Sequence, residues 1–298
     1  MTVNYAAPLE PDEIDDVEVD EPVVKPKPRH RRKGMLFAGI GLIVVAVIAI
    51  VAGLSYVAPE FVSEAQFQDV RNHAYDVDDS GQEEGDPSGL DWDYLNGLNG
   101  DIKAWLTVEN TNIDYPVMQS SDNDFYLWRG MDGVSNDVGT PFIDYRCADG
   151  ADSENVVVYG HHMGISHTVF DAISHSYTQD VFDGLGRVWW KTPGKLTEFK
   201  VAYAMRVEER YGKVQTFEFK DDKPVLVQGM TWTDAQQNAW ESDPRPVFKA
   251  WLDDMHSDAT AEAAGYTSLG VPRALCLVTC SEPWANAPWR CVLVCVPA

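Results

Sequence analysis

The chain has 298 residues, of which 47 are Asp or Glu and 23 are Lys or Arg, so its formal net charge at pH 7 is −24. Residues 1–33 hold eight acidic and six basic residues, which leaves 39 acidic against 17 basic residues and a net charge of −22 on the rest. Such a charge repels polyanions at long range, which argues against nucleic acid or anionic lipid as a partner of the later part of the chain.

The N-terminus is a polar tail. Its acidic stretch, Met1 to Glu21, is followed by the basic run KPKPRHRRK. Blocks of like charge with few large apolar residues are typical of disorder. We therefore predict that residues 1–33 form a disordered tail.

An uncharged apolar segment follows, from Gly34 to Pro59. A helix needs about 20 apolar residues to cross a bilayer, and this run exceeds the roughly 7 to 15 residues of a cleaved signal's apolar region. We predict a retained transmembrane helix at residues 34–58. Because the basic cluster stands before the span, the positive-inside rule predicts a single-pass cell-membrane protein with a cytoplasmic N-terminus and everything after residue 60 outside.

After the span, residues 59–90 are predicted to be an extracellular stalk or linker, although Glu60 to Tyr75 has a loosely helical spacing that would continue the span outward. Residues 91–298 are predicted to be one domain, large enough to bury its own core. It opens with a predicted short helix from Leu90 to Leu106. A second helix is predicted within Thr231 to Tyr266.

Short strand-like runs dominate the rest of the domain, and turn residues separate many of them, which indicates a β-barrel or sandwich. The predicted strands are Ile113 to Met118, Thr140 to Asp144, Asn155 to Tyr159, Gly186 to Lys191, Thr197 to Val207, Ala274 to Thr279 and Cys291 to Val296.

Five cysteines lie in the predicted extracellular part, so at least one is unpaired within the chain. Cys280 ends an apolar, strand-like stretch, where a nucleophile would be exposed. A reactive thiol needs a nearby base or cation and donors for the oxyanion, and His161 and Arg290 are candidates for these roles. Each of the three residues taken alone is more often structural or a surface residue.

Taken together, these residues resemble the sortase family. Leu277-Val278-Thr279-Cys280 matches most of the signature Thr-Leu-x-Thr-Cys, Tyr159-Gly160-His161 is similar to the histidine motif, and Arg290 lies just before the last strand. Further blocks resemble class B sortases: Asn99 to Leu106, Ile113 to Gln119, Asp122 to Leu127 and Gly139 to Asp144. The resemblance covers about Leu90 to Val296, with Cys276 in place of the first Thr of the signature.

The resemblance implies a mainly β fold: a closed sortase-type barrel of about eight strands, with an N-terminal helix and a helix inserted before the cysteine strand. It also implies a cysteine transpeptidase without a cofactor, with Cys280 as the nucleophile, His161 as the base and acid, and Arg290 as the cation at the substrate carbonyl. The residues that it implies for substrate binding are Asn123 and Leu127 in the groove, Thr279 and Ser281 beside the nucleophile, and Glu282. For Glu282 two alternatives stay open: it orients the site, or it is a solvated charge.

The implied substrates are secreted proteins with a C-terminal sorting signal, and the implied acceptor is an amine of a peptidoglycan precursor or a pilin. Two alternatives stay open: a secreted cysteine peptidase, in which water resolves the thioester, and a non-catalytic membrane-tethered binding domain. A metal site is not expected, because the His and Cys residues lack the usual ligand spacings. Cys276 is either a core residue or half of a disulfide with Cys291 or Cys295.

Overall fold

The structure, a computed structural model, describes residues 30–75, 86–164, 167–219, 246–284 and 287–298. Three predicted features lie wholly or partly outside these residues: most of the N-terminal tail, residues 76–85 of the linker, and residues 231–245 of the inserted segment.

The chain divides into two compact units, residues 1–52 and 53–298. The described part of the first unit consists of the beginning of helix α1, which spans His30–Ala74. From Phe37 to Ala74 this helix is long and apolar enough to cross a membrane, by length and composition alone. We therefore treat membrane anchoring as part of the proposed function.

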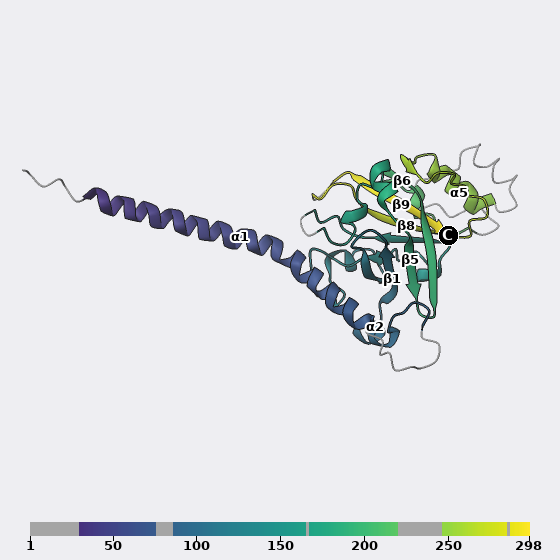
Figure 1. The fold of residues 1–298 in the computed structure, drawn as a ribbon, viewed down its shortest axis with the longest axis horizontal. Helices are drawn as coiled ribbons and strands as arrows, with labels where there is room; N and C mark the ends of the chain where they lie inside the picture. Colours follow the sequence, from purple (N-terminus) through teal and green to yellow (C-terminus); the bar gives the residue numbers. More distant parts are fainter. Residues whose placement is uncertain (1–29, 76–85, 165–166, 220–245, 285–286) are drawn as a thin grey trace, which may run out of the picture. The chain divides into compact units, whose positions relative to one another are not determined.

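The second unit is built on a nine-stranded sheet in the order β5-β1-β2-β3-β4-β8-β9-β6-β7. Because β5 also pairs with β6, eight strands close into a barrel, and β7 is an extra strand on β6. The fold class predicted from the sequence is therefore confirmed. Figure 1 shows β6, β8 and β9 side by side in the barrel wall. The strands are β1 (Ile102–Val108), β2 (Asp114–Met118), β3 (Phe142–Ile143), β4 (Asn155–Tyr159), β5 (Val188–Thr192), β6 (Lys195–Glu208), β7 (Ala261–Glu262), β8 (Ala274–Cys280) and β9 (Trp289–Pro297).

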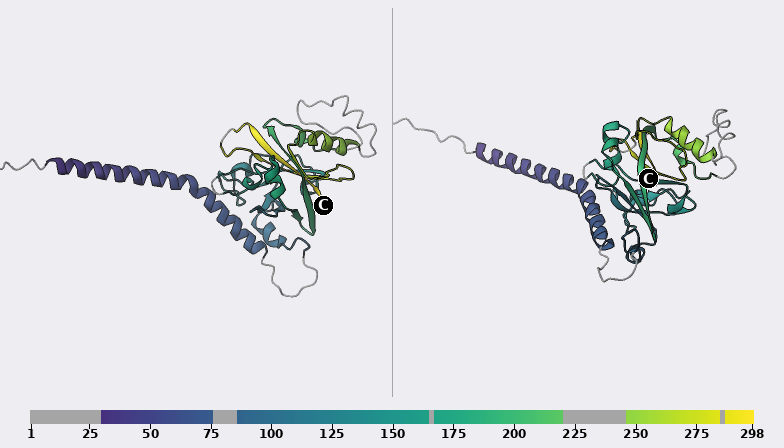
Figure 2. Two further views of the ribbon diagram at one scale, coloured as in Figure 1. Left: turned by 45° about the horizontal axis from the view of Figure 1, so that its top comes forward. Right: turned by 45° about the vertical axis from the view of Figure 1, so that its right-hand side comes forward.

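Two short helices, α2 (Trp92–Leu98) and α3 (Gln179–Gly184), and the longer α5 (Pro246–His256) accompany the sheet. The described loops contain single-turn 3₁₀ helices at Tyr126–Trp128, Gly150–Asp152, Asp171–Ile173 and Lys213–Gln215. Helix α5 lies within the predicted inserted segment, ahead of the cysteine strand β8. Figure 2 shows it against the outside of the barrel.

The predicted helix from Leu90 to Leu106 is wrong in its second half. Asp91 caps α2 by accepting a hydrogen bond from the Tyr94 amide, and the helix ends at Leu98. Asn99 is already extended, and Ile102–Val108 forms β1 between β2 and β5. Pairing on both edges satisfies the backbone groups of this segment, so tertiary context overrides the helical spacing of its apolar residues.

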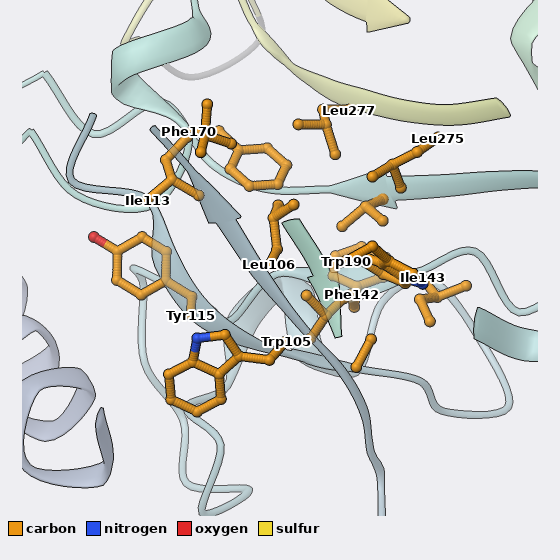
Figure 3. Close-up of a cluster of buried hydrophobic side chains, with 14 of the residues drawn as sticks. Trp105, Leu106, Ile113, Tyr115, Phe142, Ile143, Phe170, Trp190, Leu275 and Leu277 are labelled. Atoms are coloured by element: carbon orange, nitrogen blue, oxygen red, sulfur yellow. The ribbon is translucent and has the colours of Figure 1, made fainter. Parts of the chain in front are cut away.

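The barrel has an inner core and an outer apolar layer. Alternating residues of β8 point to opposite faces, so Leu275 and Leu277 lie in the inner core, whereas Cys276 and Val278 belong to the outer layer with α5. Figure 3 shows Leu275 and Leu277 beside Leu106 and Trp190 in the inner core. Burying such a side chain contributes about 1.5–3 kcal/mol.

The C-terminal end of α1 packs on the barrel within the second unit. Phe67, Val70 and Ala74 are buried in the inner core cluster. Arg71 forms an ion pair with Asp114 of β2 at 3.1 Å. Residues 59–74 of the predicted stalk therefore continue α1 and are held by the domain.

Candidate active site

Cys280 and Arg290 are partners across two antiparallel strands. Cys280 is the last residue of β8, and its register partner on β9 is Arg290. Successive side chains of a strand point to opposite faces, so Cys280 points to the same face as Val278, and Arg290 to the same face as Val292. Both valines lie in the outer apolar layer. The hairpin thus brings a thiol and a guanidinium to the same face of the sheet.

His161 reaches this face from β4, which runs parallel to β8 with Tyr159 opposite Val278. The Gly160 amide donates to the Val278 carbonyl at 3.1 Å, so the pairing continues past the end of β4. Two residues further along each strand, His161 is level with Cys280. Gly160 is required here, because a Cβ at this position would lie 2.7 Å from the Phe170 ring.

The His161 ring is held by the loop that precedes β3. Its Nε2 lies 2.8 Å from the Leu127 carbonyl oxygen, and the Trp128 ring is tilted over it with a centroid distance of 5.2 Å. A carbonyl can only accept, so Nε2 carries the proton and Nδ1 is the ring nitrogen left to exchange one. The Leu127 carbonyl packs against Gly139, where a Cβ would lie 2.6 Å from that oxygen.

A cleft of ≈ 780 Å³ contains these three residues. Its walls come from the loop at Asn123–Val138, from β4 and the residues after it, from the end of β6 and from the β8–β9 hairpin. Two Trp side chains at the cleft, Trp128 and Trp284, are 50% and 61% exposed, so the cleft has aromatic side chains open to solvent. A cleft of this size accommodates a peptide segment.

The charge state of the Cys280 thiol depends on opposing influences. Burial raises the pKa of Cys280, Arg290 lowers it, and the carboxylates of Glu209 and Glu282 raise it further. The net shift is upward, which favours the neutral thiol.

The imidazole of His161 is shifted in the opposite direction. Burial lowers the pKa of His161, the hydrogen bond to the Leu127 carbonyl and the charge of Asp137 raise it, and Arg290 lowers it. The net shift is downward. Both shifts therefore favour the neutral form, the thiol of Cys280 and the imidazole of His161.

Arg290 is held at several points. Its guanidinium donates to the carbonyl oxygens of Ala287 and Trp289 and forms an ion pair with Glu209 at 2.6 Å. Glu209 follows β6, whose pairing with β9 places Val207 opposite Arg290. The carboxylate therefore fixes the guanidinium while raising the pKa of the thiol.

Four of the five residues predicted for substrate binding line the cleft: Asn123, Leu127, Thr279 and Glu282. Ser281 is buried and is not in the cleft wall; its hydroxyl donates to Glu282, which also forms an ion pair with Arg206. The Thr279 hydroxyl is buried without a hydrogen-bond partner in the described part of the chain.

Several cleft residues were not predicted from the sequence, among them Asp137, Glu209 and Gln215. No local motif marks them, because they reach the cleft from loops and strand ends that are far from Cys280 in sequence. Their signal lies in the strand register, which a single sequence does not contain.

All five cysteines are free thiols, so the alternative of a disulfide at Cys276 is not seen. Cys276 is fully buried opposite Val294, whereas Cys291 pairs with Thr279 and Cys295 with Leu275. Cys276 is thus a core residue. Among the described residues, no cluster of three or more His, Cys, Asp or Glu side chains fits a metal ion.

No protein-family model matches the chain. Two curated relatives are sortase B proteins. That of Listeria monocytogenes is 42% identical over 69 residues, which are 23% of this chain and 28% of the relative. That of Staphylococcus aureus is 24% identical over 203 residues, which are 68% of this chain and 72% of the relative.

Solved structures of sortase B have the same fold. A Staphylococcus aureus sortase B–substrate complex aligns with a TM-score of 0.59 and 18% identity, covering 80% of this chain and 97% of that one. Clostridium perfringens sortase B aligns with a TM-score of 0.51 and 25% identity, covering 69% and 98%. The chain is a class B-like sortase.

Its enzyme class is accordingly that of a cysteine transpeptidase, and the cleft contains a cysteine. Among the sortase's described cysteines, Cys280 lines the cleft, while the other four are buried elsewhere. This difference in access makes Cys280 the thiol that a substrate in the cleft can reach.

Proposed function

We propose that this sortase cleaves a C-terminal sorting signal of secreted proteins and transfers the acyl group to an amine, using Cys280, His161 and Arg290. One observation carries the proposal: the register of β4, β8 and β9 brings a thiol, an imidazole and a guanidinium together in one cleft. These are the groups required for nucleophilic attack, proton transfer and charge stabilisation at a carbonyl.

In the acylation half, the Cys280 thiolate attacks the scissile carbonyl carbon and forms a C–S bond. The carbonyl oxygen becomes an oxyanion, which the Arg290 guanidinium stabilises. The C–N bond then breaks, and the leaving amine takes a proton from the imidazolium of His161. The products are a thioester on Cys280, a neutral imidazole and the released C-terminal fragment.

In the transfer half, an acceptor amine attacks the thioester carbonyl and gives a proton to His161. The C–S bond breaks, and the new amide leaves with the thiolate of Cys280 and the imidazolium of His161 restored. Because one proton goes out and one returns, the cycle needs no cofactor.

The peptide is proposed to lie along the walls formed by Asn123, Leu127, Thr279 and Glu282. Ser281 acts behind this surface, since its hydroxyl is bonded to Glu282. The Asn123 amide is already oriented, because its nitrogen donates to Asp144 and its oxygen accepts from the Tyr145 amide. Such fixed groups lower the entropy cost of positioning a substrate.

We further propose that α1 anchors the enzyme in the cell membrane as a single span, with residues 1–33 as a cytoplasmic tail and the catalytic domain outside. The apolar segment 34–58 and the basic cluster before it support this orientation. Anchoring raises the effective concentration of substrates held at the same surface. The proposed acceptor is an amine of a peptidoglycan precursor or a pilin.

The test uses the full-length protein in detergent micelles with a library of sorting-signal peptides, and mass spectrometry of the trapped adduct. We expect an acyl group on Cys280 and none on the Cys280→Ala variant. Adding an amine should convert the peptide into an amide product. An acyl-enzyme that yields only free acid with every amine supplied would instead identify a peptidase, and no adduct with any peptide would favour a binding domain.

A further inference from the structure

Asp144 is a fully buried carboxylate just beyond β3, and it touches neither Cys280 nor His161. Its two oxygens accept five hydrogen bonds. Arg146 supplies three of them, from its backbone amide and Nε at 2.9 Å and from Nη2 at 2.6 Å. Asn123 Nδ2 and the Tyr159 hydroxyl supply the other two, both at 3.0 Å.

These contacts form part of a closed polar ring. Gln215 donates to the Tyr159 hydroxyl at 3.2 Å and accepts from Arg146 at 3.5 Å. Asn123, Tyr159 and Gln215 all line the cleft, whereas Asp144 lies behind them. Because the carboxylate at the centre of these contacts is fully buried and has several donors, the hydrogen bonds hold its half-buried partners in one arrangement.

Two of the residues that bind Asp144, Asn123 and Tyr159, are each connected along the chain to a residue that places the His161 imidazole. Asn123 stands four residues before Leu127, whose carbonyl oxygen binds His161 Nε2. Tyr159 is the last residue of β4 and stands two residues before His161 itself. The loop that binds the imidazole and strand β4, which leads to His161, are therefore joined to each other through the Asp144 carboxylate.

We propose that Asp144 is a positioning residue for His161: it sets the spacing between the 123–127 loop and the end of β4, and thereby keeps His161 Nε2 on the Leu127 carbonyl. The expected effect on turnover rests on the proposed function. The expected effect on the position of the His161 imidazole does not depend on that function.

Asp144→Asn is the most direct test, because it keeps the size of the side chain and removes its charge. The amide can accept at one oxygen only, so it cannot serve the Arg146 fork together with Asn123 and Tyr159. We expect the loop and the strand to move relative to each other. A displacement of about 1 Å can cost on the order of 100-fold in rate, so kcat/KM should fall by about 10- to 100-fold, mainly through kcat.

A second readout follows His161 directly. In the full-length protein the His161 Nε2 proton, bonded to the Leu127 carbonyl, should give a protected NMR signal that exchanges slowly with water. In Asp144→Asn this signal should shift and exchange at least several-fold faster. This measurement needs no substrate, so it separates a failure of the present inference from a failure of the proposed transpeptidase activity.

Two further variants complete the design. Tyr159→Phe removes one hydrogen bond to Asp144 and retains the ring, and it should give a smaller change in the same direction; it decides the question if Asp144→Asn does not fold. Asp152→Asn is the matched control, since Asp152 is an ion-paired carboxylate bound to Lys195 at the surface and does not line the cleft. It should leave both readouts within twofold of the wild type.

The inference is overturned if the folded Asp144→Asn protein keeps the wild-type His161 Nε2 signal, whatever its turnover. It is also overturned if Tyr159→Phe, in place of an unfolded Asp144→Asn, leaves that signal unchanged. A changed signal in these variants with an unchanged Asp152→Asn control supports it.

Discussion

Cys280 and Arg290 are register partners at the loop end of the β8–β9 hairpin, and Arg290 is bound in turn to Glu209. The guanidinium lowers the pKa of the thiol, while the carboxylate raises it. The same ion pair that orients Arg290 therefore restrains the ionisation of Cys280. A substrate carbonyl that binds the guanidinium has to share it with Glu209.

Glu209→Gln should lower the pKa of Cys280, because it removes a negative charge that opposes the thiolate. The thiolate would then form at lower pH, so iodoacetamide should alkylate Cys280 about two- to tenfold faster near pH 7, since each pKa unit changes the thiolate population about tenfold. The measurement is the alkylation rate against pH, read on Cys280 by mass spectrometry.

Glu208→Gln is the matched control for this variant. Glu208 also lines the cleft, but it is not among the groups that act on the thiol. Its alkylation profile should follow that of the wild type. An unshifted profile in Glu209→Gln would contradict the assignment of Glu209 as an opposing charge.

Asp137→Asn should lower the pKa of His161 further, because the Asp137 carboxylate favours the imidazolium. The acidic limb of the kcat/KM profile should move to lower pH, and the change in rate near pH 7 should be less than about tenfold for one screened charge at the cleft edge. NMR titration of the His161 ring measures the pKa directly. Asp132→Asn, in the same loop and bonded to the Val134 amide, should leave the His161 titration unchanged. A rise in the pKa of His161 in Asp137→Asn would contradict the inference that the Asp137 carboxylate raises this pKa.

Gly139→Ala should displace the carbonyl that holds His161, because the new Cβ would lie 2.6 Å from the Leu127 oxygen. Backbone at φ +63 adds strain, so we expect a loss of about 2–4 kcal/mol in unfolding free energy and a fall of about 10- to 100-fold in peptide cleavage. Chemical denaturation and kcat/KM measure the two effects.

Gly133→Ala is the control that separates backbone strain at positive φ from the steric clash with the Leu127 carbonyl. Gly133 has a similar φ of +76 with no atom within 4 Å of the added Cβ. It should lose only about 1–2 kcal/mol and keep its activity. Equal losses of activity in the two variants would show that backbone strain alone, and not the contact with Leu127, disturbs the site.

Local sequence patterns were sufficient to predict the secondary structure of segments whose apolar residues follow the period of the element that they form. The run at Asn155–Tyr159 and the stretch ending in Cys280 form β4 and β8, and the helical spacing of Val247, Trp251 and Met255 corresponds to α5. They were insufficient at Leu90 to Leu106, where Trp105 and Leu106 also have a helical spacing. There the edges of β2 and β5 provided hydrogen-bond partners that a local pattern does not contain.

By itself, the amino-acid sequence determined most of the strand segments, the apolar N-terminal segment, and which thiol, imidazole and guanidinium stand at strand ends. Only the tertiary structure decided that β4 pairs in parallel with β8, which brings His161 level with a cysteine 119 positions further along the chain. It also decided that Glu209 faces Arg290 and that Asp144 joins Asn123 to Tyr159. The reason is physical: register and burial are set by contacts between distant segments, and a carboxylate acquires its role from the charges and donors that folding places around it.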